Sequence, residues 1–198
     1  MKKFVVILLC FFSADCLVIG ASTVLSSQPN IVFIFSDDHA TQALSAYGHE
    51  ISKIAQTPHS DKVAENGIRF DRCLVGNSIC GPSRATILTG TYSHINKFYS
   101  NERTAFDGSQ PTFPKILQAN NYQTALIGKW HLASEPTGFD HWEILPGQGS
   151  YYNPDFITPN GKHRETGYVS ELVTKKALYW LQNPRAENQP FLLMVQHK

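Results

Sequence analysis

The chain has 198 residues, of which 42% are hydrophobic and 17% are charged. This size and composition are typical of one globular domain with a substantial core, and they exclude an intrinsically disordered chain. The formal net charge is +1 with both signs mixed along the chain, so no general field attracts nucleic acid or an anionic membrane, and any anion must bind at a local site.

The first residues have the layout of an export signal. Two lysines precede an apolar run at 4–12, and small residues follow near position 20. The polar residues Ser13 and Asp15 interrupt the run before it reaches the roughly 18 apolar residues that a membrane span needs. We therefore expect residues 1–27 to be a signal peptide, cleaved between 21 and 27, and the mature protein to be periplasmic or secreted.

Cleavage of that signal removes two of the four cysteines, Cys10 and Cys16, and leaves Cys73 and Cys80. A lipid attached to Cys16 is the one membrane anchor that the sequence leaves open, although Asp15 stands where such a signal needs a small residue. In an oxidising compartment the default expectation is a disulfide between the two remaining cysteines. They lack a second pair of soft ligands at zinc spacing, which argues against a structural zinc site.

Strand-like and helix-like segments alternate after the signal, which predicts an α/β domain with a largely parallel sheet flanked by helices. The apolar run at 31–35 predicts a first strand that ends in two acids. A helix should follow, with Thr57 as its N-cap, Pro58 in its first turn and Gly67 beyond its end. The segment 68–75 is predicted to be the next strand.

The second half continues this alternation. Apolar residues at 169, 172, 173, 177, 180 and 181 form a helical stripe, whereas the Gly-, Pro- and Tyr-rich segment 136–164 shows no clear period and is predicted to be a loop. The elements predicted here are, in order, a helix from Pro82 to Gly90, a short helix at 113–121, a strand at 122–128, a helix at 168–181 and a buried strand at 190–197.

Polar residues gather where predicted strands end. Asp37 and Asp38 follow the first strand, Cys80 lies in the turn before the second helix, and Lys129 and His131 follow the strand at 122–128. Functional sites of open parallel sheets are built at this edge. We therefore expect these residues to converge on one site.

Each cluster has a structural alternative. Adjacent acids after a strand are common turn formers and helix N-caps, but two carboxylates held by a rigid strand also suit Ca²⁺ or Mg²⁺, for which two ligands alone are too few. Cys80 at a helix N-terminus lies where negative charge is favoured, and Arg84, one turn on, can reach the same face. The alternative for this pair is a small buried cysteine and a surface arginine.

The stretch "CGPSRATILTG" places Cys80, Pro82, Ser83 and Arg84 in an order that resembles the signature of the type I sulfatases, whose fold is similar to alkaline phosphatase. In that family the cysteine is oxidised to Cα-formylglycine before the chain folds, by a formylglycine-generating or an anaerobic sulfatase-maturating enzyme. The blocks "PNIVFIFSDD", "TPHSDKVAENGIRFDRC" and "GKWHL" resemble the same family in the same order. Ser60 and Ala133 depart from the family pattern at positions away from the chemistry.

The resemblance implies covalent catalysis by a hydrated aldehyde at position 80, one hydroxyl of which attacks sulfur. The remaining roles that it implies are a divalent ion, Ca²⁺ with Mg²⁺ as the alternative, bound by Asp37, Asp38 and Cys80; stabilisation of the hydrate by Arg84; sulfate binding by Lys129; and proton transfer by His131. Taken alone, Lys129 would be read as a solvated surface lysine and His131 as a packed histidine. The other histidines considered, expected at the surface or in turns, are His39, His49, His59 and His94.

Catalytic domains of this family are commonly about twice as long as this chain, and "MVQHK" resembles the beginning of a further histidine motif. We therefore expect 28–198 to be the N-terminal portion of a sulfatase catalytic domain, inactive by itself and weak in metal binding because further ligands are missing. "LPGQGSYYNPDF" after "FDHWE" resembles a bacterial subgroup that removes sulfate from glycans, including 6-sulfated N-acetylglucosamine. The alternatives are a phosphoester or phosphonate hydrolase of the same superfamily and a non-catalytic glycan-binding relative.

Overall fold

The structure is a computed structural model that describes residues 28–102, 105–183 and 185–198. The predicted signal peptide, with Cys10 and Cys16, lies outside the described residues. Within the described part, no helix combines the length and the apolar character needed to cross a membrane.

The centre of the fold is one six-stranded sheet in the order β1-β6-β2-β3-β4-β5. The strands are β1 (Ile31–Ser36), β2 (Gln123–Lys129), β3 (His141–Leu145), β4 (Asp155–Thr158), β5 (Gly161–Arg164) and β6 (Phe191–His197). The first four in the sheet order are mutually parallel, while β4 and β5 run antiparallel to their neighbours. The prediction of a mostly parallel sheet is confirmed, and the carboxyl ends of β1, β6 and β2 meet at one edge.

The sequences of the strands reflect their places in the sheet. The inner strands β2 and β6 are buried on both faces and carry continuous apolar runs, at 125–127 and 191–195, as expected for parallel strands covered on both sides. Strand β1 lies at the edge, and its burial alternates: Phe33 packs against the core while Val32 and Ile34 are exposed.

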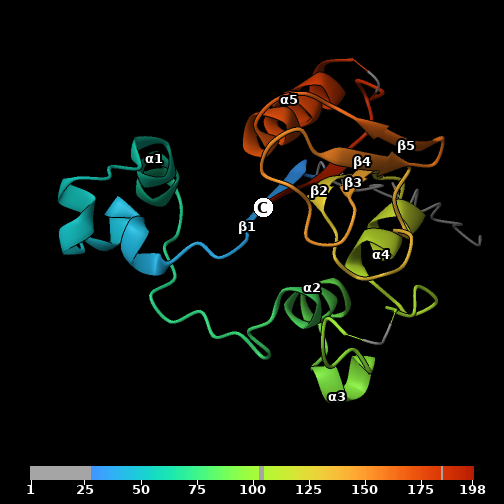
Figure 1. Ribbon diagram of the computed structural model, residues 1–198, viewed down its shortest axis with the longest axis horizontal. Helices are drawn as coiled ribbons and strands as arrows, with labels where there is room; N and C mark the ends of the chain where they lie inside the picture. Colours follow the sequence, from blue (N-terminus) through green and yellow to red (C-terminus); the bar gives the residue numbers. More distant parts are fainter. Residues whose placement is uncertain (1–27, 103–104, 184) are drawn as a thin grey trace, which may run out of the picture.

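Helices cover both faces of the sheet (Figure 1). The helix α5 (Val169–Gln182) packs Val173 and Trp180 against one face, and α2 (Cys80–Thr89) and α4 (Phe113–Ala119) pack against the other. The predicted helices at 82–90, 113–121 and 168–181 are therefore confirmed. The remaining helices are α1 (Pro58–Asn66), α3 (Ser93–Asn96) and the 3-10 helices η1 (Thr41–Ala43), η2 (Ser45–Tyr47) and η3 (Glu50–Lys53).

The helix α1 has the predicted ends, with Thr57 at the N-cap position, Pro58 in the first turn and Gly67 after the last turn. The Thr57 hydroxyl, however, accepts from the backbone N–H of Ser45 and contacts Asp61 instead of capping the helix. This ties α1 to the 3-10 helices, and the group lies apart from the sheet (Figure 1).

The predicted strand at 68–75 is wrong. This segment is an irregular connection between α1 and α2 and pairs with no strand of the described part. Ile68 is 80% exposed and Leu74 is 93% exposed, so its apolar side chains have no sheet to pack against. A short apolar pattern forms a strand only where a neighbouring strand completes its hydrogen bonds.

The predicted loop at 136–164 is also wrong, because it contains β3, β4 and β5. These strands have four or five residues each, too few for a clear period to emerge from the sequence. The hairpin β4–β5 turns at Pro159 and Asn160, and Gly161 follows with a φ of +117°. The dipeptide Asn160-Gly161 is a known hairpin signal, so a hairpin near this position could have been predicted, although its turn residues are Pro159 and Asn160.

Candidate active site

The turn before α2 presents Cys80 at the first position of the helix. Ile79 has an extended backbone, and α2 begins at Cys80, so the sulfur lies at the N-terminal, positive end of the helix dipole. Gly81 packs tightly here: a Cβ at this position would come within 2.6 Å of the Phe98 ring, and its N–H donates to Asn101 Oδ1 at 2.8 Å. A glycine after the cysteine therefore lets the helix start sit against the loop that carries Phe98.

Cys80 lies between the ends of β1 and β2. Its thiol donates to Asp37 Oδ1 at 3.6 Å, and Lys129 Nζ donates to Cys80 Sγ at 3.7 Å. Lys129 and Asp37 also form an ion pair with each other, and Lys129 is only 2% exposed. The predicted convergence of these three clusters is confirmed, and Lys129 is a buried member of the site and not a solvated surface lysine.

The expected disulfide between Cys73 and Cys80 is wrong, because both cysteines are free. Cys73 is exposed on the irregular connection 68–75, whereas the sulfur of Cys80 faces Asp37 and Lys129.

Arg84 reaches the same site from the inside. It is 2% exposed, and its Nη2 donates to Asp37 Oδ2 at 3.1 Å while its Nη1 donates to the Lys129 carbonyl at 2.8 Å and to Gln196 Oε1. Its guanidinium lies 5.0 Å from the centroid of the Phe35 ring. Arg84 is therefore a buried fork that joins α2 to β1, β2 and β6, and the reading of it as a surface arginine is excluded.

Asp37 carries the charge that balances these cations. Burial raises the pKa of its carboxyl. The hydrogen bonds and charges of Lys129 and Arg84 lower this pKa by more than burial raises it, so it lies below its usual range. Its backbone N–H donates to the carbonyl of His197 at 3.3 Å, which fixes the end of β1 against the end of β6. Asp37 is thus held ionised at neutral pH.

His131 follows β2 on the same side of the site. It has a φ of +53°, and its Nδ1 is buried without a hydrogen-bond partner in the described part of the chain. Burial, Lys129 and Arg84 lower the pKa of its imidazole, while Asp37 raises it, with a net shift below the usual value. The imidazole is therefore neutral at pH 7 and can accept a proton, although it makes no hydrogen bond with Cys80 here.

Asp38 is exposed, has a φ of +49°, and makes no hydrogen bond or ion pair with the described residues. It lines a cavity of about 650 Å³ together with Asp37, Cys80 and Arg84. His39, which was expected to be a surface or turn residue, is exposed and also lines this cavity. Asp38 is therefore an exposed residue of the cavity that Cys80 also lines.

Two glutamines in the site had no signal in the sequence. Gln196, on β6, is 3% exposed and accepts from Arg84, and Gln148, in the loop after β3, accepts from Lys129 Nζ at 2.6 Å. Both contacts join residues far apart in the chain, so no local spacing could reveal them.

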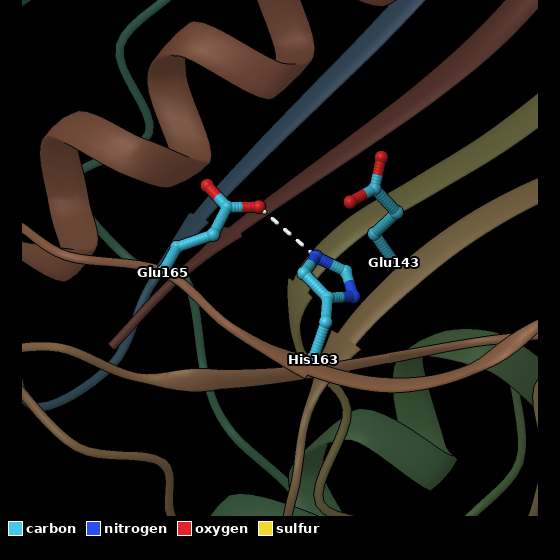
Figure 2. A group of neighbouring side chains, drawn as sticks. All are labelled: Glu143, His163 and Glu165. Atoms are coloured by element: carbon cyan, nitrogen blue, oxygen red, sulfur yellow. Dashed lines mark hydrogen bonds and ion pairs between the residues drawn. The ribbon is translucent and has the colours of Figure 1, made fainter.

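The described residues contain one compact group of potential metal ligands, and it lies elsewhere. Glu143, His163 and Glu165 each place a ligand atom within 4.8 Å of the others, and Figure 2 shows their side chains together. Lys176 Nζ already pairs with Glu143 at 2.7 Å and with Glu165, so the two carboxylates share one ammonium. The ligand atoms of the predicted set, Asp37 with its neighbours, do not form such a compact group in this structure.

The chain resembles known sulfatases in sequence and in structure. It is 53% identical over 177 residues to an N-acetylglucosamine-6-O-sulfatase of Bacteroides thetaiotaomicron. The matched region covers 87% of this chain and 31% of the relative. It is 31% identical to a mouse N-acetylgalactosamine-6-sulfatase, over 83% of this chain and 38% of the relative. A solved structure described as a complex with its substrate D-glucosamine-2-N,6-O-disulfate superposes with a TM-score of 0.82 at 51% identity, over 86% of this chain and 34% of that one.

These comparisons cover nearly the whole described chain, which itself spans about a third of the length of these relatives. The family model for sulfatases matches residues 29–197, a range that includes every residue of the site described above. The chain therefore belongs to the sulfatase family, with the alkaline-phosphatase-like fold expected from its motifs.

Proposed function

We propose that the full-length protein is a sulfatase that hydrolyses sulfate esters of glycans such as N-acetylglucosamine 6-sulfate. One observation carries this proposal: Cys80 stands at the start of α2 within hydrogen-bond reach of both Asp37 and Lys129, in a chain of the sulfatase family. The relative at 53% identity, an N-acetylglucosamine-6-O-sulfatase, supports the choice of substrate.

The Cys80 thiol stands in for the oxygen atoms of the formylglycine hydrate into which we propose it is converted. When formed, that group supplies a hydroxyl nucleophile for sulfur. The N-terminus of α2 and the ammonium of Lys129 both favour negative charge at this position, so they stabilise an ionised hydroxyl there.

The other residues bind the sulfate and move protons. Lys129 offers a fixed positive charge to the sulfate oxygens, and the buried fork of Arg84 holds the charge of Asp37 and the end of β2 in place. His131, neutral at pH 7, accepts a proton from the attacking hydroxyl of the hydrate and passes it to the oxygen of the departing alcohol.

A hard divalent cation, Ca²⁺ with Mg²⁺ as the alternative, fits the oxygen donors of this site. Asp37 and Asp38 follow the same strand and line the same cavity, and the Asp38 carboxylate has no partner among the described residues. Position 80 would be the third ligand from this chain, after Asp37 and Asp38. Further ligands are needed because Ca²⁺ takes about six to eight oxygens. Such an ion would polarise a sulfate oxygen.

We further propose export through the signal at 1–27 to the periplasm or the medium, and maturation of Cys80 by a formylglycine-generating or anaerobic sulfatase-maturating enzyme. The apolar run and the lysines before it support export. The motif residues Pro82 and Arg84, which such an enzyme reads in the extended chain, support maturation.

The test uses the full-length protein made together with a maturation enzyme. Trypsin releases residues 73–84 as one peptide, because it cleaves after Arg72 and after Arg84. We expect its mass to show an aldehyde oxygen in place of the sulfur of Cys80, and the protein to hydrolyse aryl sulfate and 6-sulfated N-acetylglucosamine but not aryl phosphate. Active protein with an unmodified thiol at position 80 would refute the mechanism, and preference for phosphate would favour the phosphoester hydrolase.

A matched variant separates chemistry from folding. Cys80→Ala removes the nucleophile but leaves a side chain that the first turn of α2 accommodates, so turnover should vanish while the thermal unfolding midpoint stays close to that of the parent. Residual turnover of this variant would contradict the role of position 80.

A further inference from the structure

Lys129 is held by three acceptors. Its ammonium has three protons, and the three acceptors around Nζ are Asp37 Oδ2, Cys80 Sγ at 3.7 Å and Gln148 Oε1 at 2.6 Å. Asp37 follows β1 and Cys80 begins α2, while Gln148 comes from the loop that follows β3. The direction of the Lys129 ammonium therefore depends on this loop as well as on Asp37 and Cys80.

The loop is built to hold Gln148 in place. Gly147 and Gly149 on either side of it have φ values of +52° and +71°, a region that favours glycine, and the N–H of Gly149 donates to the carbonyl of Pro146 at 2.9 Å. A Cβ at Gly149 would lie 2.9 Å from Leu145 Cδ1, so the turn is also packed against β3.

The far end of the loop is fixed too. The N–H of Val169, the first residue of α5, donates to the carbonyl of Tyr151 at 2.8 Å, and the N–H of Asn153 donates to the carbonyl of Gly167 at 2.8 Å. The segment that carries Gln148 is thus tied at both ends, which limits the movement of its backbone.

The chemistry of the amide sets its orientation. A lysine ammonium only donates, so the oxygen of the Gln148 amide must face Lys129, and the –NH₂ group must point elsewhere. That nitrogen has no acceptor among the described residues, and the side chain is exposed. The two N–H donors of the Gln148 amide are therefore open to solvent, on the same amide group whose oxygen contacts Lys129, the residue that we propose binds sulfate.

We propose that Gln148 determines specificity for sulfated sugars over other sulfate esters. Its oxygen orients Lys129 toward the sulfate, and its –NH₂ donates to an acceptor oxygen of the pyranose, a hydroxyl or the ring oxygen, beside the ester. An aryl sulfate offers no such oxygen, so its binding depends only on the contact between the Gln148 oxygen and Lys129. This inference rests on the proposed sulfatase activity.

The test compares Gln148→Met, which keeps the length of the side chain but removes both polar contacts, with the parent enzyme on two substrates. We expect kcat/KM for aryl sulfate to fall about tenfold, through the loss of one hydrogen bond to Lys129, and kcat/KM for 6-sulfated N-acetylglucosamine to fall about a hundredfold, with the larger share in KM. The control is Gln118→Ala on α4, whose amide donates to Asp140 at 2.6 Å near the amino end of β3, and which should leave both ratios unchanged.

Binding provides a readout that needs no turnover. In the Cys80→Ala background, Gln148→Met should raise the Kd for 6-sulfated N-acetylglucosamine about tenfold, as measured by calorimetry. The Kd for aryl sulfate should rise less. Equal losses on both substrates, or losses below twofold, would overturn the inference. If the parent hydrolyses neither sulfate, the proposed function has failed, whatever the variant does.

Discussion

Replacing Arg84 by lysine tests whether the site depends on the shape of the guanidinium or only on its charge. Arg84 donates to three acceptors in different directions: Asp37 Oδ2 at 3.1 Å, the Lys129 carbonyl at 2.8 Å and Gln196 Oε1. A lysine ammonium is a single point on a shorter stem and can keep about one of these contacts.

The expected cost follows from the burial of this network. Two acceptors lose their donor in a region where Arg84 is 2% exposed, and each unpaired buried acceptor costs about 1–3 kcal/mol. We therefore expect Arg84→Lys to lower the free energy of unfolding by about 2–6 kcal/mol. Because Lys129 and Asp37 lose a common support, kcat/KM for aryl sulfate, counted per molecule that carries the aldehyde at position 80, should fall by a factor on the order of 100.

Urea denaturation followed by tryptophan fluorescence measures the stability, and initial rates on aryl sulfate measure turnover. The matched control is Arg69→Lys, since Arg69 pairs with Asp71 at 2.8 Å on the surface, and an exposed pair contributes about 0–1 kcal/mol. If Arg84→Lys unfolds at the same urea concentration as Arg69→Lys and keeps full turnover, the planar fork has no special role and the reasoning is refuted.

Three further predictions concern backbone space, pH and metal. Gly128→Ala should cost about 3 kcal/mol or more in urea unfolding, because φ is +111° and the new Cβ would overlap the Gln196 carbonyl oxygen; a stable variant would show that β2 and β6 can separate. Hydrogen bonds from His141 and Lys176 hold the pKa of Glu143 at about 2, below its usual 4.5, so its contribution to stability should be complete above pH 4.5 and lost as pH falls toward 2. In Glu143→Gln this part of the pH dependence of the unfolding free energy should disappear, and an unchanged profile would contradict the assignment. Chelation should abolish turnover and added Ca²⁺ or Mg²⁺ restore it, whereas full activity after exhaustive chelation would exclude the cation.

The parts of the fold that sequence reasoning predicts well are those whose pattern is long or chemically specific. The fourteen-residue helix α5 shows a complete apolar stripe, and the inner strands β2 and β6 contain the apolar runs 125–127 and 191–195. The motif from Cys80 to Gly90 predicted both a helix and a site, because it specifies a helix start and a chemical group together.

The failures have a common physical cause, which is that tertiary contacts decided the outcome. The segment 68–75 has the residues of a strand but no neighbour to pair with, and β3 to β5 are strands only because they pair with each other and with β2. Gln148 and Gln196 entered the site through contacts between distant segments, and a single glutamine carries no spacing that would predict them.

The strand order has a consequence for the time at which the protein matures. In the described chain β1 is bonded to β6 alone, and β6, although last in sequence, separates β1 from β2. During synthesis Asp37 and Lys129 therefore cannot be aligned around Cys80 until residues 191–197 have left the ribosome. More than a hundred residues are translated between Cys80 and that moment, and this interval leaves the cysteine in an open chain, accessible to the enzyme that we propose oxidises it.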